Sequence, residues 1–212
     1  MEDVIIKKTE GWQMIVEIYN DYVIKYPKNR DQMKNIIINY LKSIGKEFEL
    51  QDRINKMFKD IEKSIKIIKS SSIPRKYLSN LKFLKGSRIK QTKIRVLEEI
   101  FNSFKDQKKI EEIIDKYIEF VVLLWKYRIH ENTYKICSNF GLMDSEIVLM
   151  DPFEITNEKE KVLSQIQRKK WAKPQKYAGK INKKAIDYLI KKANETWTEE
   201  RLNEVWGTEE RL

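Results

Sequence analysis

The stretch NFGLMDSEIVLMDPFE, residues 139–154, joins a short and dense apolar run to an aspartate. Residues 147–150 are all apolar, which is typical of a buried β-strand. Asp151 follows at once and precedes Pro152. Because an unpaired buried charge is costly, the carboxylate of Asp151 must lie at the exit of the strand or meet a partner. The stretch therefore predicts a strand whose end carries either a functional group or a simple turn cap.

The composition is that of a globular chain. It has 212 residues, 41% of them hydrophobic and 35% charged, which excludes the disordered class. No apolar run approaches the roughly 18 residues of a membrane span, and residues 1–11 lack the basic-then-apolar order of a signal peptide. Cys137 is the only cysteine. We therefore expect no membrane association, no intrachain disulfide and a cytoplasmic location.

The formal net charge of +11 is unevenly distributed. Residues 168–192 contain ten basic side chains and one acidic one, Asp187. The basic residues are Arg168, Lys169, Lys170, Lys173, Lys176, Lys180, Lys183, Lys184, Lys191 and Lys192. Such a segment attracts phosphates and predicts a nucleic-acid interface, with a solvated lysine-rich surface as the alternative. Trp171 and Tyr177 lie inside it, and we favour packing over base stacking for both.

The first ninety residues predict one antiparallel sheet and two helices. Alternating apolar residues predict a hairpin over residues 3–27, with an Asn-Asp turn at residues 20–21. Apolar residues at helical spacing predict helices over residues 29–48 and 50–71. A second hairpin is predicted to turn at Gly86.

The remainder is predicted to be mainly helical. Residues 120–125 are apolar nearly all round, as in a helix buried in the middle of a domain. An irregular loop over residues 130–138 and a short strand pair follow. The predicted fold class is α+β, with residues 1–92 as an N-terminal part and residues 93–212 as a larger helical part. Two parts in this order predict a cleft between them.

Three features of the sequence form one constellation. Lys25 lies in the predicted strand DYVIKYP and follows Gly11. The polar segment IHENTYKICSNFGL follows the long buried helix and contains Asn139. The apolar strand EIVLMDPFE contains Asp151. This order resembles the protein-kinase-like superfamily, including its small atypical members.

The resemblance implies a two-lobed kinase-like fold that binds ATP and Mg²⁺ between its lobes. By the resemblance, Lys25 holds the phosphates beneath a loop reduced to Gly11, and Asn139 and Asp151 hold the metal. The strand and connector around Gln91 would meet the adenine. A triphosphate brings about four negative charges, and Mg²⁺ prefers oxygen ligands, so a lysine, an amide and a carboxylate suit this ligand.

The chain departs from the family pattern at the catalytic base. The family places an aspartate five residues before the metal-binding asparagine, and here that position is Tyr134, which is no carboxylate base near neutral pH. His130 and Glu131 are the nearby base candidates. Glu47 and Glu49 are the candidate helix partners of Lys25.

A second departure lies at the metal aspartate. The family's D-F-G is replaced by Asp151-Pro152-Phe153, and the proline removes a backbone donor and fixes φ.

Three functions follow from these patterns. The first is a phosphotransferase that uses ATP and Mg²⁺ with an unknown acceptor or protein partner. The second is a pseudokinase that keeps the fold without the chemistry. The third is a basic helical module that binds nucleic acid through residues 168–192.

Overall fold

The computed structural model describes residues 4–173, 176–177 and 179–211. The strands are β1 (Lys7–Glu10), β2 (Met14–Ile18), β3 (Tyr22–Pro27), β4 (Lys82–Phe83), β5 (Ile89–Thr92), β6 (Arg95–Val96), β7 (His130–Glu131), β8 (Phe140–Met143), β9 (Glu146–Leu149) and β10 (Ile155–Thr156). The α-helices are α1 (Arg30–Ser43), α2 (Leu50–Ser70), α3 (Leu97–Ser103), α4 (Gln107–Lys126), α5 (Ile136–Asn139), α6 (Lys159–Gln167), α7 (Lys183–Thr196) and α8 (Glu199–Val205). Short 3-10 turns are η1 (Glu47–Glu49), η2 (Arg75–Leu78), η3 (Pro152–Glu154) and η5 (Thr208–Arg211).

The N-terminal strands form a five-stranded sheet in the order β1-β2-β3-β5-β4, with every neighbouring pair antiparallel. Both predicted hairpins and the Asn-Asp turn at residues 20–21 are confirmed. In the central register, Lys25 of β3 lies opposite Val16 of β2 and Ile89 of β5. The α+β class is therefore confirmed.

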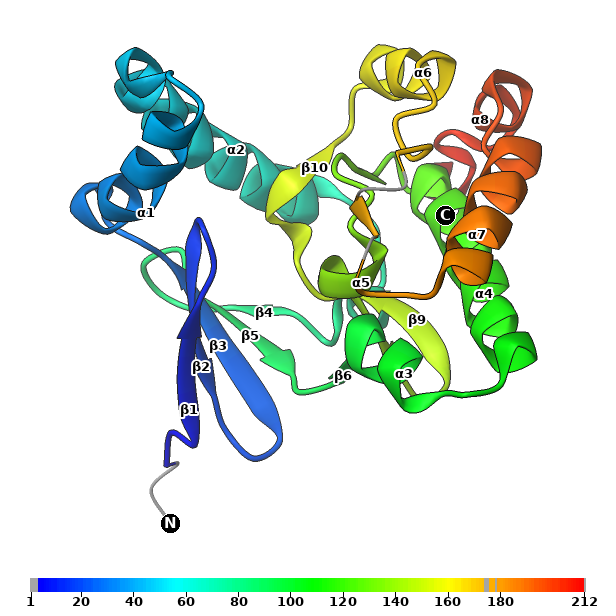
Figure 1. Ribbon diagram of the computed structural model, residues 1–212, viewed down its shortest axis with the longest axis horizontal. Coiled ribbons are helices and arrows are strands. Elements are labelled where there is room, and N and C mark those ends of the chain that lie inside the picture. Colours follow the sequence, from blue (N-terminus) through cyan, green and yellow to red (C-terminus); the bar gives the residue numbers. More distant parts are fainter. Residues whose placement is uncertain (1–3, 174–175, 178, 212) are drawn as a thin grey trace.

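Helices α1 and α2 form within the ranges that the sequence predicts, although α1 ends at Ser43 and not at residue 48. Asn29 caps α1, because its side chain accepts a hydrogen bond from the Gln32 backbone N–H at 2.9 Å. The Gln32 side-chain oxygen in turn accepts from the Asn29 backbone N–H at 2.9 Å. Helix α2 reaches from α1 to β10 (Figure 1). Its Ser64 hydroxyl lies 3.4 Å from the Ile155 backbone N–H, which donates to it. Helix α2 thus contacts both helix α1 of the N-terminal part and the C-terminal half.

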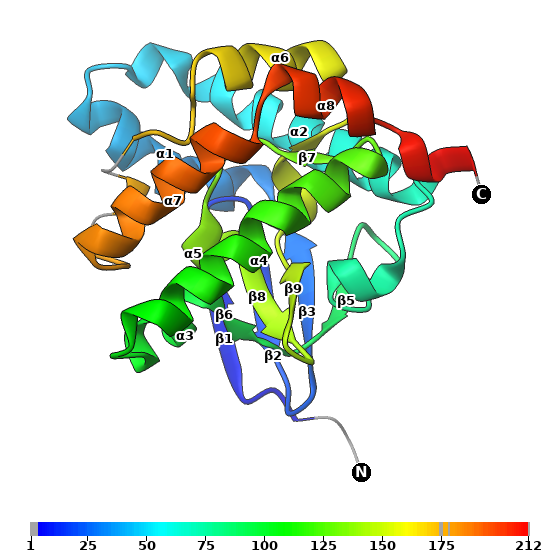
Figure 2. The same ribbon diagram turned by 90° about the vertical axis from the view of Figure 1, so that its right-hand side faces the viewer.

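The C-terminal half is built around α4, whose Leu124 and Trp125 are completely buried. Helices α7 and α8 pack against α4 (Figure 2). Trp171 and Tyr177 are buried to 1% and 2% exposure, so the predicted packing role of both is confirmed. A continuous cluster of buried apolar residues extends through both halves of the chain.

A second small sheet, in the order β6-β8-β9, joins the connector to the predicted strand pair. Gly141 of β8 lies so close to the connector that a Cβ would stand 2.5 Å from the Arg95 carbonyl oxygen and 2.6 Å from Ile94 Cδ1. Only glycine permits this approach.

The prediction of an irregular loop over residues 130–138 is partly wrong. Strand β7 there pairs with β10, and the turn of helix α5 follows before Asn139. Elements of two to four residues carry too little periodicity for a sequence pattern to reveal. Within the described parts of the chain, no helix is both long and apolar enough to span a bilayer.

Candidate functional site

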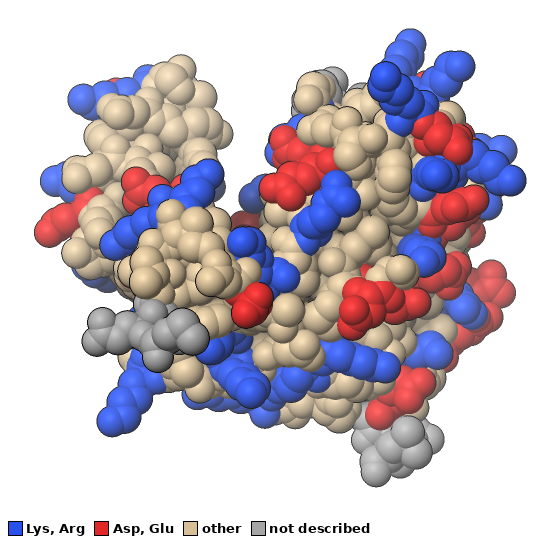
Figure 3. Space-filling model, turned by 90° about the horizontal axis from the view of Figure 1, so that it is seen from below, with Lys and Arg blue, Asp and Glu red and all other residues tan. Residues whose placement is uncertain are grey.

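A pocket of about 770 Å³ lies between the β1–β2 hairpin, helices α1 and α2, and the segment from α5 to η3. Figure 3 shows the surface hollowed between the side that carries the sheet and the side that carries the C-terminal helices, with basic side chains on both sides. The lining includes Gly11, Lys25, Asn139 and Asp151. The structure therefore brings together four residues that are distant in sequence.

Lys25 is the most deeply buried charged group of this pocket, with 6% of the residue exposed. Its ammonium donates to the carbonyl oxygen of Met150. Burial lowers the pKa of Lys25, and the nearby negative charge of Asp151 opposes that shift. An ammonium held in this way is ready to pair with an anion, because it has left most of its hydration behind.

Asp151 is fixed through Asn139. The backbone N–H groups of Met150 and Asp151 both donate to the Asn139 carbonyl oxygen, at 2.9 and 3.2 Å. Strand β9 ends at Leu149, so Asp151 lies two residues beyond the strand and before the η3 turn. The predicted carboxylate at the strand exit is therefore present, half-buried on the pocket wall.

The Asn139 side chain is oriented by Glu131. Its Nδ2 donates to Glu131 Oε1 at 3.1 Å and to Thr133 Oγ1 at 3.2 Å. The Asn139 amide oxygen accepts from the Ser138 hydroxyl at 3.1 Å. Because Nδ2 is engaged on the protein side, the amide oxygen is the atom through which Asn139 can serve a ligand.

Glu131 lies behind the pocket rather than in it. It is 3% exposed and accepts bonds from the backbone N–H groups of Thr133 and Tyr134, at 2.9 and 2.7 Å, and from the Thr133 hydroxyl. Burial raises the pKa of Glu131, and the bonds from Thr133 oppose the rise. The carboxylate therefore holds the loop and Asn139 in place.

His130 and Tyr134 are also placed away from the pocket. His130 is 1% exposed, its Nδ1 accepts from the Trp125 indole N–H at 2.9 Å, and burial lowers its pKa to about 3. Tyr134 adopts a positive φ of 56° and packs among His130, Trp171 and Trp197. Neither base candidate, His130 or Glu131, lines the pocket.

The other predicted ligand-binding residues divide in the same way. Gly11 lines the pocket, and a Cβ there would meet nothing within 4 Å. Gln91 does not line it, because its side chain is buried and donates to the Leu78 carbonyl at 2.9 Å. Glu49 pairs with Lys46 at 2.8 Å, and neither Glu47 nor Glu49 lines the pocket.

Several lining residues were missed by the sequence patterns. From α2, Arg53, Lys56 and Asp60 face the pocket, and Asp60 lies 2.5 Å from Lys56. Their spacing of three and four residues along one helix face is a signal that could have revealed them. Trp12, an aromatic residue in a turn beside Gly11, is a second such signal.

A salt bridge within the C-terminal half also lines the pocket. Lys135 and Glu154 both line the pocket, and their side chains lie 3.2 Å apart.

The described lining is cationic, with five basic and three acidic side chains. The basic ones are Lys25, Arg53, Lys56, Lys135 and Lys180, and the acidic ones are Asp60, Asp151 and Glu154. In the described part of the chain, no three His, Cys, Asp or Glu side chains gather as a metal cluster. The Asp151 carboxylate and Asn139 amide oxygen nevertheless match Mg²⁺, which binds proteins through one or two oxygen ligands and takes the rest from phosphates and water.

The basic segment does not form one uniform face. Lys170 and Lys176 turn inward and donate to the carbonyls of Asn132 and Thr133 at 2.6 and 3.0 Å. Burial lowers the pKa of Lys176 to about 8, and the charge of Lys170 adds to this. Residues 174, 175 and 178 of this segment lie outside the described residues. Two of the ten cations thus support the loop that positions Asn139.

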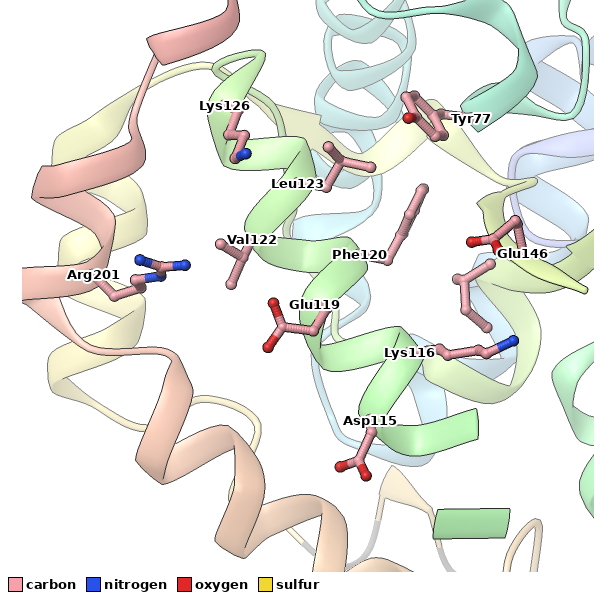
Figure 4. A pocket seen from close by; sticks show the side chains of 11 residues that line it. Tyr77, Asp115, Lys116, Glu119, Phe120, Val122, Leu123, Lys126, Glu146 and Arg201 are labelled. Carbon is pink, nitrogen blue, oxygen red and sulfur yellow. The ribbon is translucent and has the colours of Figure 1, made fainter. Parts of the chain in front are cut away.

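A smaller pocket of about 510 Å³ lies on the outer side of α4 (Figure 4). Two of its charged groups have partners outside the pocket: Lys116 donates to the Ser145 carbonyl at 2.8 Å, and the Asp115 carboxylate accepts from the Tyr188 hydroxyl at 2.9 Å. None of the predicted site residues lines it.

Comparisons with known proteins do not add a relative. No model of a known protein family and no curated protein matches the chain.

Proposed function

We propose that this chain is a kinase-like protein that binds ATP with Mg²⁺ in the 770 Å³ pocket. One observation carries the proposal: Gly11, Lys25, Asn139 and Asp151, from segments far apart in the sequence, line the same pocket. A small antiparallel sheet followed by a mainly helical half also agrees with the resemblance in the sequence. The net positive lining suits a polyanion.

Each residue has a separate task in this proposal. The Lys25 ammonium neutralises phosphate oxygens, and its low exposure strengthens that attraction. Asp151 and the Asn139 amide oxygen hold Mg²⁺, which supplies positive charge at the phosphates when it is bound. Gly11 leaves open space at the hairpin turn, so the backbone can approach the ligand.

Binding without phosphoryl transfer is the second candidate. It is favoured by the burial of Tyr134 and by the placement of His130 and Glu131 outside the pocket. If transfer occurs, a carboxylate that lines the pocket must assist the acceptor, and Glu154 is the one next to Asp151 on η3.

A melting scan tests the proposal. ATP with Mg²⁺ at a hundred times its dissociation constant stabilises the folded state by about 2.7 kcal/mol, a rise of about 5–10 °C for a chain of this size. We expect this rise in the wild type and its loss in Asp151→Ala and Lys25→Met. Asp187→Ala, which removes an exposed carboxylate on α7 outside the pocket, is the control and keeps the rise.

The same samples separate the two candidates. Slow transfer of the γ-phosphoryl group to water, measured as release of ADP and inorganic phosphate that depends on Glu154, indicates a phosphotransferase. Stabilisation without this release indicates a pseudokinase. Absence of any ATP-dependent shift in the wild type would reject both.

A further inference from the structure

The pocket extends from Lys25 in one direction along the sheet. In the register, Tyr22 lies opposite Thr92, so the connector to the C-terminal half leaves the sheet at the Tyr22 end of β3. Met14 lies opposite Pro27, so the β1–β2 turn with Trp12 lies beyond the other end of β3. Lys25 stands between these two ends. A triphosphate held at Lys25 therefore leaves the Trp12 end of the pocket for another ligand.

Two aromatic side chains form the wall of this end. Trp12 and Tyr40 both line the pocket, although they are 50% and 46% exposed. Their rings meet edge to face at 5.2 Å and 73°. Because an edge-to-face pair leaves ring faces uncovered, a ligand ring can stack there. Aromatic stacking of this kind adds affinity for planar rings of many types.

The charges around the aromatic wall favour a negative group. Arg53, Lys56, Lys135 and Lys180 line the same pocket, against Asp60 and Glu154. The partners of Arg53 and Lys180 are Glu49 and Glu98, at 3.2 and 3.5 Å, and these two acids do not line the pocket. The cations therefore exceed the acids at the pocket wall. An anionic ligand gains attraction from both sides of the pocket.

We propose that the Trp12 end of the pocket binds the phosphate acceptor, and that this acceptor is a small molecule with a planar ring, a negative group and a hydroxyl. The proposal rests on the function proposed above. The ring stacks on Trp12, and the negative group lies near Arg53 and Lys56.

Phosphoryl transfer at this site needs only ATP and the acceptor. The acceptor hydroxyl oxygen forms a bond to the γ-phosphorus of ATP as the bond to the β,γ-bridging oxygen breaks. The bonding electrons leave with ADP, and the hydroxyl proton passes through the Glu154 carboxylate to water. The products are ADP and a phosphorylated ring compound.

Three probes that differ in one feature test the chemical class. 4-Hydroxybenzoate has the ring and the charge, 4-hydroxybenzamide lacks the charge, and lactate lacks the ring. Dissociation constants are measured by ligand-observed NMR with the protein saturated with Mg²⁺ and a non-hydrolysable ATP analogue. We expect 4-hydroxybenzoate to bind at least fivefold more tightly than either of the other two.

Variants then locate the binding. We expect Trp12→Ala to weaken 4-hydroxybenzoate at least fivefold with ATP affinity unchanged. We expect Lys56→Gln to weaken 4-hydroxybenzoate severalfold, and more than it weakens ATP. Phe48→Ala and Lys59→Gln are matched controls, because Phe48 is 81% exposed and neither residue lines the pocket. Both controls should bind the probe as the wild type does.

The outcomes separate this inference from the proposed function. If ATP binds and 4-hydroxybenzoate does not, or if Trp12→Ala leaves its affinity unchanged, the acceptor site is rejected and the nucleotide site stands. Weaker ATP binding in Trp12→Ala would place the adenine on Trp12 and would also reject the acceptor site. If ATP does not bind the wild type, the proposed function itself fails, whatever the probes do.

Discussion

Gly141→Ala tests the contact that joins the connector to the second sheet. The new Cβ would stand 2.5 Å from the Arg95 carbonyl oxygen, whereas ordinary contact begins at 3.4 Å, so β8 and β6 must separate by about 0.9 Å. Overpacking of this kind costs about 1–3 kcal/mol. The β6–β8 ladder has only two paired positions, and its loss adds about 1 kcal/mol for each hydrogen bond broken.

The expected total is about 2–4 kcal/mol of lost unfolding free energy, which lowers the melting temperature by about 4–16 °C in a chain of this length. Urea unfolding and a melting scan measure it. Gly11→Ala is the matched control, because a Cβ there meets nothing within 4 Å, and its change should stay within about 0.5 kcal/mol. Equal stability of the two variants would refute the close approach at Gly141.

Three further predictions concern the loop and the basic segment. The pKa of His130 falls from 6.5 to about 3 on folding, so the stability that its neutral form contributes above pH 6.5 is lost as the pH drops. Urea unfolding should show a loss of about 2 kcal/mol between pH 7 and pH 5. The variant His130→Gln should not show this loss. Glu131→Ala leaves buried donors of the loop without an acceptor, so we expect a loss of about 3 kcal/mol and, through Asn139, of the ATP-dependent shift. Lys183→Glu with Lys184→Glu should abolish salt-sensitive RNA binding in a filter assay if the segment is a nucleic-acid interface, and wild-type binding by this variant would reject that function.

The sequence was sufficient for the elements with strong periodicity. The alternation around β2 and β3, the helical spacing of α1 and α2 and the apolar surface of α4 each predicted an element that the structure contains. These patterns succeed because each element buries one face against a common core. The register that places Lys25 opposite Ile89 could not be predicted, since it depends on pairing across more than sixty residues.

The residues that line the candidate site could be predicted from the sequence, whereas the buried residues that hold them in place could not. Lys25, Asn139 and Asp151 stand out because a charged or amide group beside an apolar strand needs a reason. Glu131 and His130 are also polar residues of the kind that active sites use, and nothing in their spacing shows that their side chains point into the protein interior. Burial decides between a base and a structural group, and burial is a property of the packed molecule.

The buried charges of Lys25 and Glu131 around Asn139 give a separate reason to expect a ligand. A buried ammonium at Lys25 and a buried carboxylate at Glu131 both cost desolvation energy, as the directions of their pKa shifts show. Glu131 offsets its cost with hydrogen bonds from the loop, whereas Lys25 has one carbonyl, from Met150, and the charge of Asp151. An apolar side chain at position 25 would stabilise the fold more than the lysine does. The anion that we propose for this pocket would complete the pairing of this incompletely compensated cation.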